Sequence, residues 1–204
     1  MSALTPNLRG SAVLQPALGQ FSTRANLPRS AAKIPATVRA WLGRFVLLLA
    51  LEARADIKVG DGFPILAEHG VVTLNGGELP ALAGKVVLVD FWASWCAPCK
   101  ASFPSLARLQ RDYSARGLVI AAVSIDEKSG AAASFAKKMS PPFPTLHDPA
   151  QKLVRAVVVP TMPTSYLLGR DGKVRFVHPG FHGETTEREL RKQIESLLAE
   201  KSSS

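Results

Sequence analysis

Apolar residues along the chain fall into short runs separated by turn residues, and this pattern predicts several buried strands. Residues 71–74 and 85–92 read as strands, and residues 75–77 (Asn-Gly-Gly) supply a turn between them. Because KVVLVDFW (85–92) is almost continuously apolar, it predicts a central strand that is covered on both faces. LVIAAVSID (118–126) reads as the next buried strand.

Between these two strands, the apolar residues recur with the period of a helix. The pattern predicts a helix over 97–115, kinked at Pro104 and ended by Gly117. A strand, a helix and a strand in this order predict a right-handed parallel crossover. The apolar face of the helix carries Phe103, Leu106, Leu109 or Gln110, and Tyr113.

The C-terminal half predicts a second group of elements. Residues 131–139 read as a helix and residues 143–148 as a short strand. Strands over 164–168 and 173–178 are joined through Asp171-Gly172, which is a strong hairpin signal. These elements extend the sheet predicted from the first half.

A last helix is expected to begin at Thr186, with Glu189 completing a capping box. With the preceding elements it predicts an α/β domain over residues 56–200, whose mixed sheet has helices on both faces, followed by a disordered tail, 201–204. The residues that this helix is expected to bury are Leu190, Ile194, Leu197 and Leu198.

Most of the net charge of +9 lies at the N-terminal end of the chain. Residues 1–44 hold six of the 25 basic residues and no acid, which leaves 19 basic against 16 acidic residues elsewhere. Residues 1–37 are rich in Ser, Ala, Pro and Arg without periodicity, so they are expected to form a disordered basic leader. Since neither a basic helix nor a base-stacking motif accompanies this charge, we predict no nucleic-acid partner.

Residues 38–55 carry the pattern of an export signal. Arg39 and Arg44 flank the apolar run 45–51, and residues 53–55 (Ala-Arg-Ala) form a cleavage signature. The run is too short to span a bilayer comfortably. We therefore favour a signal peptide or an N-terminal membrane anchor, and a periplasmic or cell-envelope location. An amphipathic or buried helix and a mitochondrial transit peptide are the alternatives.

Cys96 and Cys99 are the only cysteines in the chain, and their C-x-x-C spacing is used for metal binding or for redox chemistry. A structural zinc site needs four ligands, and no second cysteine pair is present. His178 and His182 are separated by a Pro-Gly and are expected to be loop residues instead of ligands. We therefore predict no metal and no other cofactor, and interpret the pair as a redox dithiol.

Cys96 lies where a strand ends and a helix begins, which places its sulfur near unpaired N–H groups and the positive end of the helix dipole. This environment favours the thiolate, which is the nucleophilic form. In the Ala97-Pro98 loop, the proline suits the first helical turn because its missing N–H would have no partner there. Cys99, one turn later, is the natural resolving thiol in a cycle through a mixed disulfide.

VDFWASWCAPC (89–99) resembles the active-site strand and turn of the thioredoxin superfamily, and TMPTSYLLGRDGKV (161–174) resembles its cis-proline segment and terminal hairpin. The long segment 126–163 and GFHGETTERELRKQIESLL (180–198), with an exported leader, resemble the TlpA-like group of periplasmic or membrane-anchored thiol–disulfide oxidoreductases. The likeness covers about residues 57–200 and implies a thioredoxin-like three-layer α/β/α fold with a central mixed sheet.

The resemblance also implies roles for single residues. Cys96 would be the attacking thiol and Cys99 the resolving thiol. Pro163 would be the cis-proline lying against the disulfide, and Pro160 is a nearby competitor for that role. Met162 would offer backbone hydrogen bonds to a bound peptide. Trp95 would either contact partners or pack into the core, and Trp92 would shield the site.

Asp90 is a carboxylic acid inside an apolar strand, where burial should raise its pKa. Such a group could accept the proton of Cys99 when the mixed disulfide is resolved, directly or through a water molecule. The alternative is a structural aspartate bonded to neighbouring backbone at a strand end. Many thioredoxins carry a lysine beside this acid, and the matching position here is Ala122.

Two further positions depart from related sequences. Ser102 stands where many TlpA-like sequences carry a glutamate, and Thr164 follows Pro163 where the cytochrome-maturation branch often has a glutamate. The second departure lowers the expectation of a dedicated role in cytochrome c assembly.

The leading hypothesis is a monomeric thiol–disulfide oxidoreductase that reduces disulfide-containing proteins of the cell envelope and is recharged by an upstream membrane or soluble dithiol donor. A peroxide-reducing redoxin with antioxidant activity is one alternative, although the Thr-x-x-Cys pattern it needs is missing. A copper-binding assembly factor would use three residues between its cysteines, and a non-catalytic interaction module would make the pair incidental.

Overall fold

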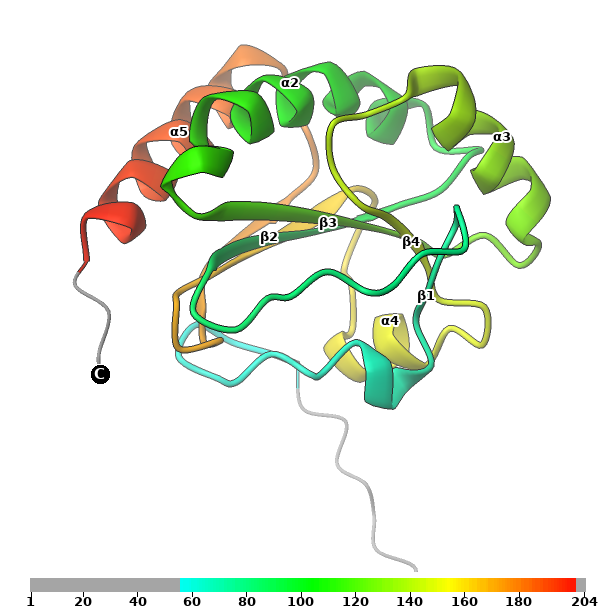
Figure 1. Cartoon of the computed structure of the whole chain (residues 1–204), viewed down its shortest axis with the longest axis horizontal. Coiled ribbons are helices and arrows are strands. Elements are labelled where there is room, and N and C mark those ends of the chain that lie inside the picture. The colour runs from blue at the N-terminus through cyan, green and yellow to red at the C-terminus, as the bar shows by residue number, and fades with distance from the viewer. Residues whose placement is uncertain (1–55, 201–204) are drawn as a thin grey trace, which may run out of the picture. The chain divides into compact units, whose positions relative to one another are not determined.

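The structure, a computed structural model, describes residues 56–200, and the expectations for the leader (1–37), the export segment (38–55) and the tail (201–204) lie outside the described residues. Its strands form one six-stranded sheet in the order β1-β4-β3-β2-β5-β6 (Figure 1). The strands are β1 (Val72–Thr73), β2 (Val86–Trp92), β3 (Leu118–Ser124), β4 (Thr145–His147), β5 (Thr164–Leu168) and β6 (Val174–Pro179). The helices are α2 (Ala97–Tyr113), α3 (Ser129–Met139), α4 (Lys152–Val157) and α5 (Glu184–Ala199), with short 3-10 turns η1 (Ala67–His69) and η2 (Ser114–Arg116).

The sheet is mixed, as the sequence predicts. β2, β3 and β4 run parallel, and α2 forms the connection from β2 to β3. β5 pairs antiparallel with β2, and β6 and β1 pair antiparallel with β5 and β4. The β5–β6 hairpin turns at the predicted Asp171-Gly172, where Gly172 has a φ of 74°. The central position of β2 brings the start of α2 to the middle of the domain.

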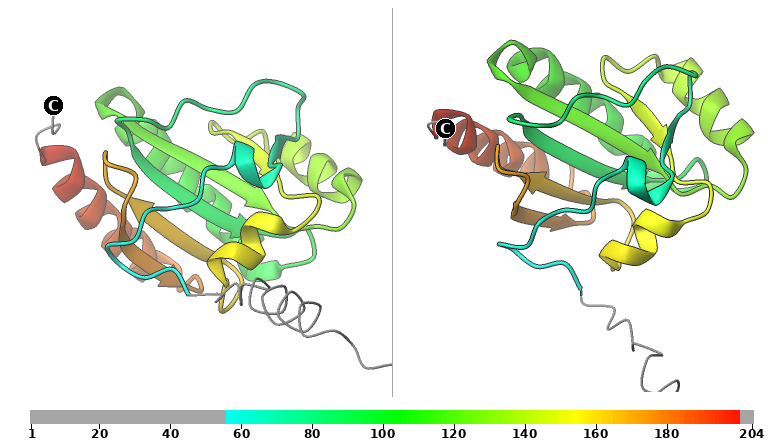
Figure 2. Two further views of the ribbon diagram at one scale, coloured as in Figure 1. Left: turned by 90° about the horizontal axis from the view of Figure 1, so that it is seen from below. Right: turned by 60° about the horizontal axis from the view of Figure 1, so that its bottom comes forward.

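Alternate residues of β2 explain why both faces of the sheet are covered. Val86, Leu88 and Trp92 pack with apolar residues of α2, α3 and α5, whereas Val87 and Phe91 pack with residues of α4 and the N-terminal segment. Figures 1 and 2 show α2, α3 and α5 on one side of the sheet and α4 on the other. The predicted thioredoxin-like three-layer arrangement is therefore confirmed. No helix within residues 56–200 is both long and apolar enough to cross a membrane.

The helix α4 has no counterpart among the elements expected from the sequence. Its six residues are too few to show a helical period. The buried Asp148 carboxylate accepts hydrogen bonds from the backbone N–H groups of Lys152 and Val154, each at 2.9 Å. At the other end, the Tyr166 hydroxyl of β5 donates to the Val157 carbonyl at 3.2 Å. Tertiary hydrogen bonds thus hold both ends of this short helix.

The capping box expected at the start of the last helix is wrong. α5 begins at Glu184, and the preceding Gly183 has a φ of 63°, a left-handed conformation that favours glycine. Thr186 lies inside the first turn, where its Oγ1 accepts a hydrogen bond from the His182 N–H at 2.9 Å. Leu190, Ile194 and Leu197 are buried as expected, whereas Leu198 is only partly buried.

Gln110 replaces a missing strand at one edge of β3. β4 is so short that its pairing with β3 starts only at Ala122. Gln110 is buried in α2, and its Oε1 accepts a hydrogen bond from the Ile120 N–H at 2.8 Å, while its Nε2 donates to the Leu118 carbonyl at 3.5 Å. The side chain therefore satisfies backbone groups that β4 does not reach.

We expect Gln110→Leu to lower the free energy of unfolding by about 1–3 kcal/mol, because the buried Ile120 N–H and Leu118 carbonyl lose their partners. Urea unfolding of the oxidised protein measures this loss. Arg111→Leu, on the exposed face of the same helix, is the control and should stay within about 0.5 kcal/mol of the parent. Equal stability of the two variants would show that the Gln110 contacts contribute nothing.

Candidate active site

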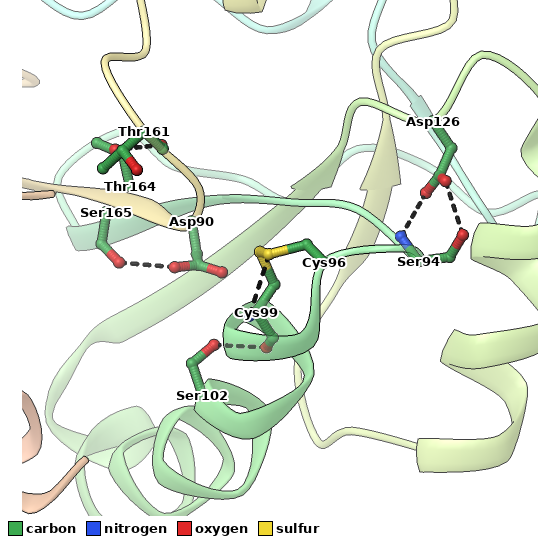
Figure 3. Close-up of a disulfide and its surroundings, with 9 residues drawn as sticks. All are labelled: Asp90, Ser94, Cys96, Cys99, Ser102, Asp126, Thr161, Thr164 and Ser165. Carbon is green, nitrogen blue, oxygen red and sulfur yellow. Dashed lines mark hydrogen bonds between the residues drawn. A yellow bond between two sulfur atoms is a disulfide. The ribbon is translucent and has the colours of Figure 1, made fainter. Parts of the chain in front are cut away.

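Cys96 and Cys99 form a disulfide at the start of α2, with Cα atoms 5.3 Å apart (Figure 3). Cys96 is the residue that caps the helix, and its Sγ accepts a hydrogen bond from the Cys99 N–H at 3.2 Å. Pro98 occupies the first turn, as predicted. Cys96 keeps 5% of its surface exposed and Cys99 keeps none, so an external sulfur can approach only Cys96.

The other residues expected around the pair lie at the same end of the sheet. The peptide bond between Met162 and Pro163 is cis, as the resemblance implies for Pro163 in preference to Pro160. Thr164 pairs with Phe91, so Pro163 comes next to the end of β2 from which the cysteine loop leaves. Met162 is partly buried against the core.

The two tryptophans before the pair lie in different environments. Trp95 is 68% exposed, so the core-packing alternative for this residue is wrong, and its contact with partners stays a prediction. Trp92 is fully buried, and its ring contacts Phe103 and Phe135 at centroid distances of 5.0 and 5.3 Å. Trp92 therefore closes the core beneath the cysteine loop.

Asp90 is almost fully buried in the middle of β2, with 1% of its surface exposed. Its Oδ1 accepts a hydrogen bond from the Ser165 hydroxyl at 2.6 Å, and its Oδ2 has no partner. Burial raises the pKa of Asp90 to about 7, against the Ser165 hydrogen bond, which lowers it. The backbone partner expected in the structural alternative is wrong, because the carboxyl group bonds instead to a side chain on the neighbouring strand.

Strand register explains the surroundings of Asp90. It has the same parity as Leu88 and Trp92, so it faces the α2 layer that carries Cys99. Ala122 of β3 lies directly opposite it, which confirms that this position holds no basic partner. In Figure 3 the carboxyl group of Asp90 lies between Ser165 and the disulfide.

Ser102 and Thr164 stand where related sequences often carry glutamates, and each hydroxyl is hydrogen-bonded to a backbone carbonyl three residues earlier. The Ser102 Oγ donates to the Cys99 carbonyl at 2.8 Å, and the Thr164 Oγ1 donates to the Thr161 carbonyl at 2.8 Å. Neither position brings a carboxylate to the pair. Asp90 is therefore the acid that faces the disulfide from the sheet.

Asp126 also belongs to the site, although its place in the sequence pattern indicates only the last residue of a strand. β3 ends at Ser124, and the Asp126 carboxylate accepts hydrogen bonds from Ser94, two residues before Cys96 (Figure 3). The available signal was a pair of polar residues ending a parallel strand beside β2, since the carboxyl ends of neighbouring parallel strands share one edge of the sheet.

Of the two histidines considered as metal ligands, His182 lies in a loop as expected and His178 does not. His178 lies in β6 and not in a loop, and its Nε2 is hydrogen-bonded to Gln193 Oε1 of α5 at 2.7 Å. His182 lies in the connection between β6 and α5. Within residues 56–200, no group of three or more His, Cys, Asp or Glu side chains is arranged to hold a metal ion.

Comparisons with known proteins agree with this geometry. A family model described as Redoxin matches residues 58–194. The thiol-disulfide oxidoreductase ResA of Bacillus thuringiensis (strain Al Hakam) is 34% identical over 145 residues, which cover 65% of this chain and 84% of that protein. ResA of Bacillus subtilis (strain 168) is 36% identical over 97 residues, 48% of this chain and 54% of that protein.

Solved structures share the fold. A Chlorobium tepidum protein assigned as the thiol:disulfide interchange protein DsbE has a TM-score of 0.65 and 36% identity, and the match covers 71% of this chain and 100% of that one. A secreted Mycobacterium tuberculosis disulfide oxidoreductase has a TM-score of 0.55 and 24% identity over 62% of this chain and 94% of that one, which supports the fold alone.

Proposed function

The chain belongs to the redoxin family and is a thiol–disulfide oxidoreductase, and we propose that it reduces disulfides of proteins in the cell envelope. The observation that carries this proposal is the Cys96–Cys99 pair at the start of α2, above the buried Asp90. The pattern of an export signal in residues 38–55 supports the cell envelope as the location.

The first step is an attack by the Cys96 thiolate on one sulfur of a client disulfide. A Cys96–client disulfide forms, the client S–S bond breaks, and the second client sulfur leaves as a thiolate that takes a proton from water. The Cys99 N–H and the helix dipole stabilise the attacking thiolate, because both place positive charge beside Cys96 Sγ.

In the second step Cys99 attacks Cys96 Sγ, which forms the Cys96–Cys99 disulfide, breaks the Cys96–client bond and expels the attacked client sulfur as a thiolate that takes a proton from water. Asp90 takes the proton of Cys99 and then passes it to water, since a carboxyl group with a pKa of about 7 is largely ionised just above neutral pH. The client gains two electrons and two protons. An upstream dithiol, membrane-bound or soluble, then reduces the Cys96–Cys99 disulfide and supplies two electrons and two protons.

Client binding uses the exposed rim of the pair. Trp95 offers a large exposed aromatic surface, and the backbone of Met162 beside Pro163 offers hydrogen-bonding groups to an extended peptide. We propose that the protein acts on its clients as a monomer.

An insulin-reduction assay with dithiothreitol, combined with a redox titration against glutathione, tests the proposal. We expect the protein to accelerate insulin precipitation, and the pair to have a potential at or below that of the glutathione pool, about −240 mV. No acceleration would overturn the oxidoreductase mechanism. A potential near that of protein disulfide isomerase, about −180 mV, would overturn the reducing direction and leave the mechanism in place.

A further inference from the structure

We propose that Asp126 is a positioning residue for Cys96, because its carboxylate fixes the turn that carries the attacking thiol. This inference rests on the proposed function and extends it to a residue outside the cysteine motif. Asp126 lies beyond the end of β3 and is 32 positions from Ser94 in sequence. Its side chain bonds to Ser94 and not to either cysteine sulfur.

The Asp126 carboxylate accepts two hydrogen bonds from one residue, Ser94. The Ser94 N–H donates to Asp126 Oδ2 at 2.9 Å, and the Ser94 hydroxyl donates to Oδ1 at 2.7 Å. The hydroxyl of Ser124 donates to the same Oδ2 at 2.7 Å. Asp126 is 5% exposed, and its carboxylate accepts three hydrogen bonds. The two from Ser94 fix the position and the orientation of that residue.

Asp126 is itself held in place, so it can serve as an anchor. Its N–H donates to Ser124 Oγ at 3.1 Å, and its carbonyl accepts a hydrogen bond from His147 Nε2 of β4 at 2.7 Å. The preceding Ile125 is tied by its N–H to the Trp92 carbonyl at 3.0 Å. The Asp126–Ser94 hydrogen bonds therefore connect the cysteine loop to strands β3 and β4 of the sheet.

The held turn leads directly to the thiol. The Cys96 N–H donates to the Ala93 carbonyl at 3.1 Å and closes a four-residue turn around Ser94 and Trp95. The Trp95 side chain is exposed, so packing of this side chain into the core does little to hold the turn in place. Fixing Ser94 thus fixes the backbone of Cys96, whose Sγ must stay within reach of the Cys99 N–H.

The charge and the position of Asp126 act on Cys96 in opposite directions. A negative charge near a thiolate raises the thiol pKa, so removing the charge alone would lower that pKa. Releasing the turn moves Sγ away from the Cys99 N–H and the helix terminus, which raises the thiol pKa. The sign of the change therefore separates positioning from a simple charge effect.

The test is the pH profile of iodoacetamide alkylation of Cys96 in the reduced full-length protein, with peptide mapping to distinguish Cys96 from Cys99. For Asp126→Asn we expect the midpoint to rise by about one pH unit and the rate at neutral pH to fall roughly three- to tenfold. Ser94→Ala, which removes only the hydroxyl contact and keeps the charge, should shift the midpoint in the same direction by less.

Asp148→Asn is the matched control. Asp148 is also a buried aspartate that accepts two backbone N–H bonds, but it serves α4, so its replacement should lower the melting temperature and leave the Cys96 midpoint unchanged. An unchanged or lowered midpoint in Asp126→Asn would overturn the proposal. If that variant does not fold, an unchanged midpoint in Ser94→Ala overturns it. The assay needs no client, so its result is independent of insulin reduction by the parent protein.

Discussion

A Cys96→Ser variant is expected to show no insulin reduction above the dithiothreitol background, whereas a Cys99→Ser variant is expected to accumulate as a covalent adduct with its substrate. Cys96 is the thiol with exposed surface, and Cys99 is fully buried in the first turn of α2. Without Cys96 no sulfur can reach a client. Without Cys99 the mixed disulfide forms but nothing inside the protein displaces the client.

Non-reducing gels of each variant mixed with a disulfide-containing substrate measure this difference. The Cys99→Ser adduct should be stable and should dissociate on addition of dithiothreitol. Ser102→Ala, which changes a hydroxyl one turn further along the same helix, serves as the control and should turn over like the parent protein. A stable adduct with Cys96→Ser but none with Cys99→Ser would reverse the assigned roles.

Asp90→Asn is expected to stabilise the oxidised protein above neutral pH and at the same time to slow its catalysis. In the unfolded chain the carboxyl group ionises near its ordinary pKa of 3.8, whereas in the folded protein burial raises this pKa to about 7. Between these values the folded state holds a proton that the unfolded state has released. The stability of the parent protein therefore falls as the pH rises from about 4 to about 7, and it is fully present only below that range.

The size of this effect follows from the difference between the two pKa values. About three pH units correspond to about 4 kcal/mol of unfolding free energy lost by the parent protein above pH 7. Asn cannot ionise, so Asp90→Asn should lack this fall and exceed the parent protein in stability at pH 8. Urea unfolding at pH 4, 6 and 8 measures both slopes. Parallel pH profiles for the two proteins would contradict a raised pKa of Asp90.

The kinetic part of the prediction separates a catalytic from a structural Asp90. If Asp90 takes the proton of Cys99, Asp90→Asn should slow the resolution of the mixed disulfide tenfold or more, since general bases contribute roughly 10²–10⁴-fold. Its rate should also lose the ionisation near pH 7. Ser165→Ala is the matched variant, because it keeps the acid but removes the hydrogen bond that lowers the pKa of Asp90. In Ser165→Ala the pKa of Asp90, read from the pH dependence of the resolution rate, should be higher than in the parent protein.

The motif could be interpreted from the sequence because its chemistry is local. Cys96, Pro98 and Cys99 lie within one strand end and one helical turn, so residue order alone places a sulfur at a helix N-terminus. The cis bond at Pro163 followed from the resemblance of its segment, and its presence in the structure agrees. The capping box at Thr186 was misplaced because a glycine with positive φ starts α5 two residues earlier than the favoured sequence pattern.

The class of chemistry, the main strands and helices, and the burial of Asp90 could be predicted from the sequence, because each depends on residues that are neighbours along the chain. The groups that meet this chemistry are brought together by folding. Ser165 reaches Asp90 across 75 positions, and Asp126 reaches Ser94 across 32. Such contacts depend on the order and register of strands in the sheet, and a shift of one residue would turn every side chain to the opposite face.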